Sequence, residues 1–431
     1  MITWAELHDI FLENEIFQKI ADNPFLQFGT PNNQLLGARI LPDEPTFLRY
    51  FERDEMRYRI PVALDTGRYS PPPMQGDSIM IGQIRVSLSD QSTADQLTAA
   101  KLDQVTLALK NDQHGTAGDS LLIDFGTNLV QRLVTKSEVM RWEVLLRFCS
   151  TRIGVNNYFE KINFRYPLNN AWVAGQIDGN ASSVHNATTN PRTGTNNWHG
   201  TEVSEAADPL DDFYKARDIL DSQGYQMQAI YTDRYVAKLL ERNPHIAEWA
   251  RSRIVIRPDI DSQNVVSTLS RRPNRQQTNE YFLTNDFPAI NVYNQAYSIE
   301  PENVGDPTFK FFMQPPGTPK GRHYVLILGR VDNTSEIYYE EEDETITLEN
   351  VMGYNYVGIV AGRASPGRVV YSETRQRHPM GIYAEAIQST QPVILHKGAV
   401  IVIAVDELGD EGEPVNLNLP AIAHEPNGNY R

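Results

Sequence analysis

The sequence is poor in cysteine and has no long hydrophobic run. Cys149 is the only cysteine among 431 residues, so no disulfide can form within the chain. This suits folding in a reducing compartment. No stretch approaches the ~20 apolar residues of a membrane helix, and the first residues lack the basic and apolar regions of a signal peptide. We therefore expect folding in the cytoplasm with no membrane contact.

Positive charge is also scarce. The 39 Lys and Arg residues are outnumbered by 55 Asp and Glu residues, which gives a formal net charge of −16. An acidic surface repels phosphate, which argues against tight binding of nucleic acid over a broad face, although such a wall could face packed DNA without adhering to it. Basic spots such as Arg271, Arg272, Arg375 and Arg377 are expected to contact neighbouring copies rather than DNA.

Catalytic motifs are missing from the sequence. It contains no phosphate-binding GxxxxGK[ST] loop, no HExxH or CxxC pair and no GxSxG turn. The one dense carboxylate run, Glu340–Glu344, could bind Ca²⁺. It lacks the ligand spacing and the glycine of a calcium loop, so a solvated loop is favoured. We predict no catalytic residue, no metal site and no cofactor, and hence no enzyme.

The first 25 residues carry an amphipathic helical pattern. Thr3 and Glu6 form a capping box, Trp4 and Phe11 share the apolar face, and Pro24 ends the pattern. The pattern fits a core helix and an arm docked on a neighbouring subunit equally well.

The sequence from 57 to 89 predicts a long two-stranded ribbon. Apolar and polar residues alternate over 57–64 and again over 84–89, with a proline-rich stretch between the two runs. The alternation changes register near Gly82, which indicates a bulge or bend there. Two strands by themselves are marginal in water, so either the body of this chain or another copy must cover them. An ordinary hairpin on a larger sheet is the alternative.

Further along, the strongest helical pattern covers 119–150, and it would span ~45 Å. Cys149 at its end is expected to be a small buried apolar residue rather than a reactive thiol. Residues 173–204, rich in Asn, Thr and Gly, indicate an irregular surface loop or an inter-subunit arm. Residues 208–256 alternate helices and strands, which is typical of a compact α/β lobe, and 278–405 are mostly strand.

In this order the elements resemble the major capsid proteins of tailed phages, in particular the lambda-like protein E group, which has the Hong Kong 97-type fold. The ribbon at Tyr58–Leu88 is similar to the extended loop of that fold, and the helix at 119–150 to its spine helix. Ala229–Asp233, a strand running into a helix, is similar to part of the axial domain. Tyr371–Pro392 is similar to the C-terminal segment of the family. The similarity lies in the order of elements and includes no catalytic motif.

The resemblance implies an α+β chain with the Hong Kong 97-type capsid fold. Insertions near 173–204 and 300–350 depart from the family pattern. The expected parts are an N-terminal arm (1–50), the extended loop (51–105), the peripheral domain with the spine helix (106–205), the axial domain (206–300), a return to the peripheral domain (301–390), and an axial-domain strand with an acidic tail (391–431).

The same resemblance implies a head protein that self-assembles into hexamers and pentamers of an icosahedral shell around double-stranded DNA. Assembly would take place in the host cytoplasm, and the protein would remain in the virion. Expected partners are other copies, a portal protein, a decoration or cement protein, and DNA by weak non-specific contact. The alternatives are a subunit of a non-viral compartment that encloses protein cargo, and a soluble hydrolase that uses Glu340–Glu344.

Some capsids of this fold are locked by a Lys–Asn isopeptide bond whose lysine lies on the extended loop. Residues 57–100 contain no lysine, so no such bond is expected here. The contacts with neighbouring copies are expected from the ribbon and from the N-terminal helix. The candidate residues are Trp4, Phe11, Arg57, Tyr58, Arg59, Ile60, Val62, Arg68, Ile84, Arg85, Val86 and Leu88.

Overall fold

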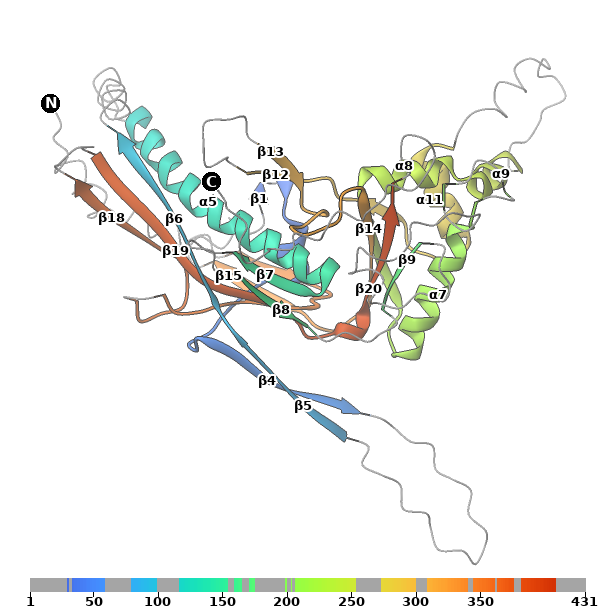
Figure 1. Cartoon of the computed structure of the whole chain (residues 1–431), viewed down its shortest axis with the longest axis horizontal. Helices are drawn as coiled ribbons and strands as arrows, with labels where there is room; N and C mark the ends of the chain where they lie inside the picture. The colour runs from blue at the N-terminus through green and yellow to red at the C-terminus, as the bar shows by residue number, and fades with distance from the viewer. Residues whose placement is uncertain are drawn as a thin grey trace, which may run out of the picture. The chain divides into compact units, whose positions relative to one another are not determined.

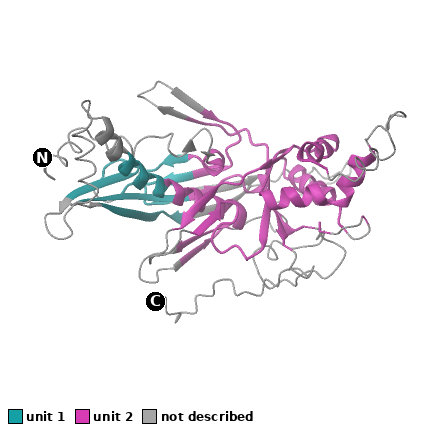
Figure 2. Ribbon diagram, turned by 90° about the horizontal axis from the view of Figure 1, so that it is seen from above, with its two compact units in different colours: residues 1–23, 43–133, 355–391 teal, residues 24–42, 134–354, 392–431 magenta. Residues whose placement is uncertain are grey.

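The computed structural model combines helices with sheets, which confirms the predicted α+β class. The residues that it describes are 29–30, 33–58, 79–98, 116–153, 159–164, 170–174, 198–199, 203, 206–252, 273–299, 308–339, 344–360, 363–375 and 381–407. The chain divides into two compact units, each assembled from stretches far apart in sequence (Figure 2). Unit 1 comprises residues 1–23, 43–133 and 355–391, and unit 2 comprises residues 24–42, 134–354 and 392–431.

The sheet of unit 1 is organised around one long strand, β19 (Gly381–Ile394). Its neighbours are β18 (Val369–Arg375) and β17 (Gly353–Val357), and β6 (Ser89–Thr98) also pairs with it. The short β3 (Asp43–Pro45) follows β17 in parallel. Ile382, Ala384 and Ala386 are fully buried while the residues between them are partly exposed, so one face of β19 carries the core.

A separate ribbon of unit 1 is formed by β4 (Tyr50–Tyr58) and β5 (Ile79–Ser87), which pair with each other and with no other described strand (Figure 1). The register runs without a break from Tyr50 opposite Ser87 to Tyr58 opposite Ile79. The bulge expected at Gly82 is therefore wrong, because Gly82 lies in regular register opposite Glu55. The ribbon also begins earlier than expected, and the predicted strand beyond Tyr58 lies outside the described residues.

The long helix α5 (Thr116–Arg147) has 32 residues, close to the range expected from the sequence. Leu129, Leu133, Met140 and Val144 lie on its buried side. The helix ends earlier than predicted because Phe148 adopts φ 57°, the left-handed conformation that stops a helix. The predicted helical end is instead β7 (Cys149–Ile153), which pairs with β8 (Phe159–Asn163).

Unit 2 is built on a five-stranded sheet of order β11 (Ile290–Val292), β10 (Met227–Thr232), β14 (Arg322–Gly329), β20 (Val400–Asp406), β9 (Ala171–Val173). Every residue of β14 is buried. Four helices belong to the same unit: α7 (Pro209–Ser222), α8 (Arg234–Arg242), α9 (Pro244–Ser252) and α11 (Arg275–Thr284). The alternation of helices and strands predicted for this stretch is confirmed.

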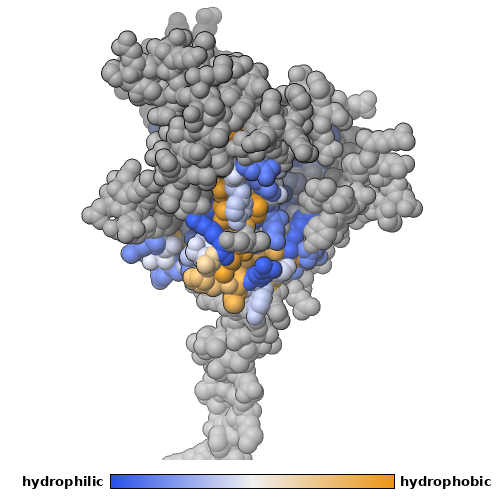
Figure 3. All heavy atoms as spheres, turned by 90° about the vertical axis from the view of Figure 1, so that its left-hand side faces the viewer, coloured by the Kyte–Doolittle hydropathy of each residue, from blue (hydrophilic) through white to orange (hydrophobic). Residues whose placement is uncertain are grey.

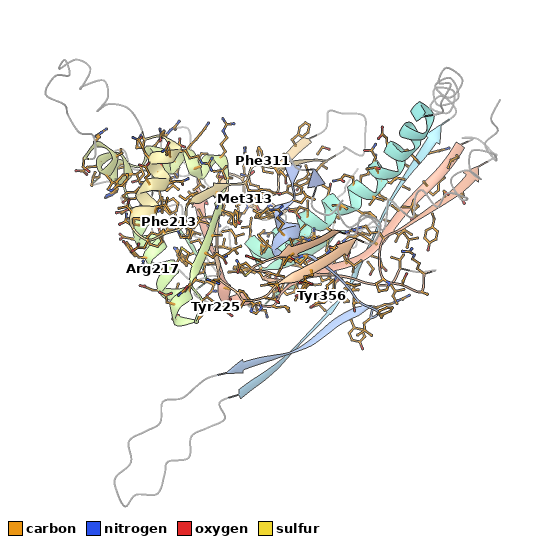
Figure 4. All side chains as sticks on the ribbon, turned by 180° about the vertical axis from the view of Figure 1, so that it is seen from behind. Phe213, Arg217, Tyr225, Phe311, Met313 and Tyr356 are labelled. Atoms are coloured by element: carbon orange, nitrogen blue, oxygen red, sulfur yellow. The ribbon has the colours of Figure 1, made fainter. Side chains whose placement is uncertain are left out.

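Aromatic side chains fill the core between these helices and the sheet. Phe213 of α7, labelled in Figure 4, meets Phe282 of α11 edge-on with 4.9 Å between ring centroids. The helix ends follow ordinary capping chemistry: Asp233 accepts the Val236 N–H at 2.9 Å, and Asn274 forms a capping box with Gln277.

The remaining described elements are short. They are β1 (Gly29–Thr30) paired with β2 (Asn33–Gln34), α3 (Leu36–Ile40), β12 (Ala296–Ile299) paired with β13 (Thr308–Phe311), β15 (Ser335–Tyr339) paired with β16 (Glu344–Leu348), and the 3₁₀ helix η3 (Lys397–Ala399). Among the described helices, none is long and apolar enough to cross a membrane.

Three described residues of the predicted surface loop 173–204 are buried: Val173 at the end of β9, Ala174 after it, and Trp198. Trp198 is 1% exposed, and its indole N–H donates to Asp212 at 2.9 Å. Trp172 donates to the other carboxylate oxygen of Asp212 at 2.8 Å. The prediction of a surface loop is wrong at Trp198, because two indole donors satisfy a buried carboxylate there.

Candidate assembly surfaces

The ribbon β4–β5 carries the predicted contact residues that the structure describes. Arg57 and Tyr58 end β4, and Ile84, Arg85 and Val86 lie in β5, with Leu88 just beyond it. No third strand of the described chain pairs with the ribbon. The other predicted contact residues lie outside the described part, so their role stays a prediction. They are Trp4, Phe11, Arg59, Ile60, Val62 and Arg68.

The strand register shows which of these residues face one another. Arg57 lies opposite Met80, whereas Arg85 lies opposite Glu52. Opposite charges facing each other across antiparallel strands favour the pairing. By register, then, Arg85 has an acidic residue opposite it and Arg57 an apolar one.

Val86 and Leu88 lie where the ribbon joins the sheet of unit 1. Val86 is 7% exposed, so its side chain packs within its own chain and leaves little surface for a neighbour. The Leu88 N–H donates to the Arg49 carbonyl at 3.1 Å. A Cβ at position 358 would lie 2.2 Å from a Leu88 methyl, so Gly358 leaves room for this side chain.

A largely buried polar network in unit 1 lies at the base of the ribbon, where the chain enters β4 and leaves β5. Asp43, in the strand that precedes it, bonds to Arg368 at 2.5 Å and accepts the Asn355 amide at 2.6 Å. Arg368 in turn donates to Gln388 of β19 at 3.0 Å. Gln388 donates to Gln91 of β6, the strand that follows the ribbon, at 2.6 Å. One residue of β19 therefore links the strands that enter and leave the ribbon.

Two exposed apolar side chains lie between β3 and β4, at the start of the ribbon. Phe47 is 71% exposed and Leu48 is 50% exposed. They were not among the predicted contact residues, because residues 1–50 were assigned to an N-terminal arm whose contacts were expected from Trp4 and Phe11. Their adjacency, directly after Pro45 and before the alternating strand, was the available signal.

A second exposed apolar group lies on the hairpin β12–β13 of unit 2. Phe309 is 71% exposed, and Phe311 and Ile299 are 41% and 40% exposed. Phe311, labelled in Figure 4, lies at the end of β13. Figure 3 likewise shows hydrophobic side chains reaching the surface on one face of the molecule. Exposed large apolar residues of this kind mark candidate contact surfaces.

Among the described residues we looked at the groups that could bind a metal ion or act as a nucleophile. No group of His, Cys, Asp or Glu among them could hold a metal ion. Of the acidic run, Glu344 starts β16, and Glu340–Asp343 lie outside the described residues. Cys149 is 3% exposed, as predicted for a buried apolar residue, and burial raises the pKa of its thiol. A thiol that stays protonated is a poor nucleophile.

No family model matches the chain, and no curated protein matches it. Solved structures do. A protein assigned as the capsid protein of a prophage of Escherichia coli CFT073 shares 12% identity at a TM-score of 0.49, over 91% of this chain and 97% of that one. The mature capsid of bacteriophage PhiM1 shares 8% identity at a TM-score of 0.41, over 88% and 89% of the two chains. A virus-like particle from Pyrococcus furiosus shares 9% identity at a TM-score of 0.39, over 90% and 98%.

The chain is similar to capsid proteins. This is the class of protein that the order of elements in the sequence resembles.

Proposed function

We propose that this chain is the major capsid subunit of a tailed-phage head, which assembles into hexamers and pentamers of an icosahedral shell around double-stranded DNA. The observation that carries the proposal is the β4–β5 ribbon, whose strands have nine residues each and pair with no other described strand. A ribbon of two strands gains too little from its own pairing to be stable in water. Another copy of the chain is the surface that supports it.

The way the ribbon is attached supports this assignment. The network of Asp43, Arg368, Gln388 and Gln91 ties its base to β19, so the ribbon leaves the sheet from a fixed point. A ribbon carried by one copy and received by the next is a heterologous contact, and repeated heterologous contacts close into rings. Permanent interfaces bury about 2,000 Å² or more, and an extended ribbon adds such area without enlarging the core.

Phe47 and Leu48 belong to the same proposed contact. They are exposed in the lone chain and lie directly before β4. Burying an apolar side chain of this size is worth about 1.5–3 kcal/mol, which is enough to influence whether copies associate.

The experiment is electron microscopy of the purified full-length chain, alone and with substitutions. We expect closed particles from the unaltered chain, and soluble, folded subunits without particles from the double variant Phe47→Ser, Leu48→Ser. Leu283→Ser is the matched control, because Leu283 is 56% exposed on α11, away from the ribbon in sequence. If the double variant forms particles as well as the control does, Phe47 and Leu48 are not part of the contact.

The arginines of the ribbon require a different choice of variant. Arg85→Glu would place two acidic residues opposite each other in the ribbon and weaken the ribbon itself, since Arg85 faces Glu52. Arg57→Glu avoids this, because Arg57 faces Met80. We propose that Arg57, Arg59 and Arg68 meet acidic groups of a neighbouring copy, so Arg57→Glu should weaken assembly more strongly at low salt than at high salt.

The enclosed material separates the phage head from a compartment that encloses protein cargo. The net charge of −16 suits a wall that faces DNA without binding it tightly. Native particles of a phage head would contain nuclease-protected double-stranded DNA and would copurify with a portal protein and, where one exists, a decoration protein. Particles that contain enzymes and no DNA would instead identify the compartment. A monomer that never assembles and that hydrolyses a substrate would exclude both.

A further inference from the structure

Two basic residues at the start of β14, Arg322 and His323, contact two acidic residues, Asp406 at the end of β20 and Glu407 just after it. Arg322 donates from Nε to Asp406 Oδ1 at 2.7 Å and from a terminal nitrogen to Oδ2 at 3.0 Å. His323 Nε2 contacts Glu407 Oε1 at 2.9 Å. The antiparallel register, with Arg322 opposite Asp406, brings the four side chains together at one end of the unit 2 sheet.

The second ring nitrogen of His323 faces another carboxylate. Nδ1 contacts Oδ2 of Asp233, and the side chains of both residues are 7% exposed. A neutral imidazole has a single N–H and could donate to only one of the two carboxylates, which would leave a lone pair facing the other. The charged imidazolium donates to both. The contacts on the two ring nitrogens therefore fit a protonated ring, and Tyr235 stacks on it with 4.1 Å between centroids.

We propose that His323 is a proton-controlled latch, which holds Glu407 against the start of β14 when its ring is charged and releases it when its ring is neutral. Asp233 is the carboxylate that the neutral ring keeps, since it is buried and also caps α8 through the Val236 N–H. Glu407 is the one released, because its side chain is already 38% exposed and can turn to water. Asp406 stays bound, since Arg322 keeps its charge over the whole range. The release therefore affects Glu407 and leaves Asp406 in place.

The other groups around the ring add no charge that opposes the latch. Gln314 Nε2 lies 3.2 Å from Nδ1 and carries no charge, and beside the charged ring the amide turns its oxygen, the acceptor, toward Nδ1. His199 contacts the Asp406 carbonyl at 2.6 Å, and burial lowers its pKa, so it adds no second positive charge near neutral pH. Among the described residues, the charged groups that contact His323 are thus Asp233 on one side and Glu407 on the other.

The direction of the pH dependence follows from these neighbours. Burial alone would lower the pKa of His323, but the hydrogen bonds and charges of Asp233 and Glu407 outweigh it and raise the pKa above 6.5. The ring is charged in the folded chain at a pH where it would be neutral in the unfolded one. The latch is complete below the unfolded pKa of about 6.5 and is lost as the pH rises through the higher folded value.

The backbone amide of Glu407 can report whether the latch is closed. Its N–H donates to the Gly321 carbonyl at 2.7 Å, and this hydrogen bond slows hydrogen exchange as long as Glu407 stays in place. Hydrogen exchange of the full-length chain would be measured from about pH 6 to about pH 9 and corrected for the intrinsic rates. Between the unfolded pKa of about 6.5 and the higher folded pKa of His323, we expect the protection of the Glu407 amide to fall about tenfold for each pH unit, and above the folded pKa it should level off. Amides inside β20 should keep their protection throughout.

Two variants make the test independent of folding problems in either one. In His323→Gln, which is uncharged at every pH, the Glu407 amide should be weakly protected throughout. In Glu407→Gln, the pH dependence should disappear, and the titration of His323 followed by NMR should move to lower pH. Glu280→Gln removes an exposed carboxylate of α11 as a charge-matched control and should behave like the unaltered chain.

Equal protection of the Glu407 amide at both ends of the pH range would overturn the latch. So would a His323 that titrates below about pH 6.5 in the folded chain. Neither result depends on whether the chain forms shells, so a failed latch and a failed capsid assignment are distinguishable.

Discussion

The ribbon of unit 1 and the central sheet of unit 2 both contain antiparallel strand pairs, but they differ in how much of their covering surface the described chain itself supplies. β14 lies between β10 and β20, and all its residues are buried. β4 and β5 have only each other among the described strands. Both regions alternate or run apolar in sequence, so the strand pattern alone does not reveal whether the covering surface comes from the same chain.

The energetics of the two regions differ accordingly. Leu326 and Ile327 of β14 are fully buried, and burying each such side chain contributes about 1.5–3 kcal/mol. The central sheet is therefore stable in a lone chain. The ribbon is attached at Asp43 and Arg368 but pairs with no other described strand, and under the proposed function another copy of the chain stabilises it.

The largest expected effect comes from removing residues 66–78, which lie in sequence between β4 and β5. Deleting them should abolish closed shells while leaving soluble subunits whose thermal unfolding is unchanged, because under the proposed function this stretch supports a neighbour and not its own chain. Electron microscopy and calorimetry on the same preparation measure the two outcomes. A subunit that unfolds much more easily after the deletion would place the ribbon among the elements that stabilise its own chain.

The attachment of the ribbon can be broken separately. Arg368→Met leaves Asp43, whose side chain is 15% exposed, without its cation, and breaking a fully buried ion pair costs about 3–5 kcal/mol, which is the upper limit for this pair. We expect this loss in denaturant unfolding, together with fewer closed particles. The double variant Arg368→Met, Asp43→Leu removes both charges and should recover most of the stability. If the double variant remains as unstable as the single one, the ion pair is not what holds the base of the ribbon.

A substitution in the central sheet should lower the stability of the subunit without affecting its assembly. Leu326→Ala creates a cavity in β14 and should lower the free energy of unfolding by about 2–5 kcal/mol. The subunits that remain folded should still assemble, since Leu326 lies inside unit 2. Assembly yield at a temperature well below the unfolding transition is the measurement, and a complete loss of particles there would contradict the division between the two regions.

Elements with strong periodicity were predictable from the sequence. The long helix, the α/β alternation of unit 2 and the strands β14, β19 and β20 follow from spacing alone. The start of β4 could not be predicted from the sequence, because its run of charged residues, Glu52–Glu55, is typical of a solvated loop. In the structure Glu52 lies opposite Arg85, which only the strand register reveals.

Other misses depended on tertiary contacts or on a single backbone angle. Phe148 adopts the left-handed conformation that ends α5, and the sequence gives no sign of it because this position is usually occupied by glycine or asparagine. Trp198 lies in a stretch rich in Asn and Thr, and its burial depends on Asp212. Asp212 itself could have been found, because it shares the buried helical face of Leu220, Ala216 and Phe213, where a carboxylate requires partners.

The smallest expected effect tests whether the ribbon contributes to its own chain at all. Cys149 is buried, and burial raises the pKa of its thiol, so a maleimide should label it only as fast as the surrounding structure opens. The intact subunit and the variant lacking 66–78 should then be labelled at the same slow rate under native conditions. Mass spectrometry of timed samples gives the rates, and the denatured chain, which reacts fully, is the control. Markedly faster labelling of the shortened chain would show that the ribbon helps to keep its own subunit closed, and the contrast between the ribbon and the central sheet would fail at that point.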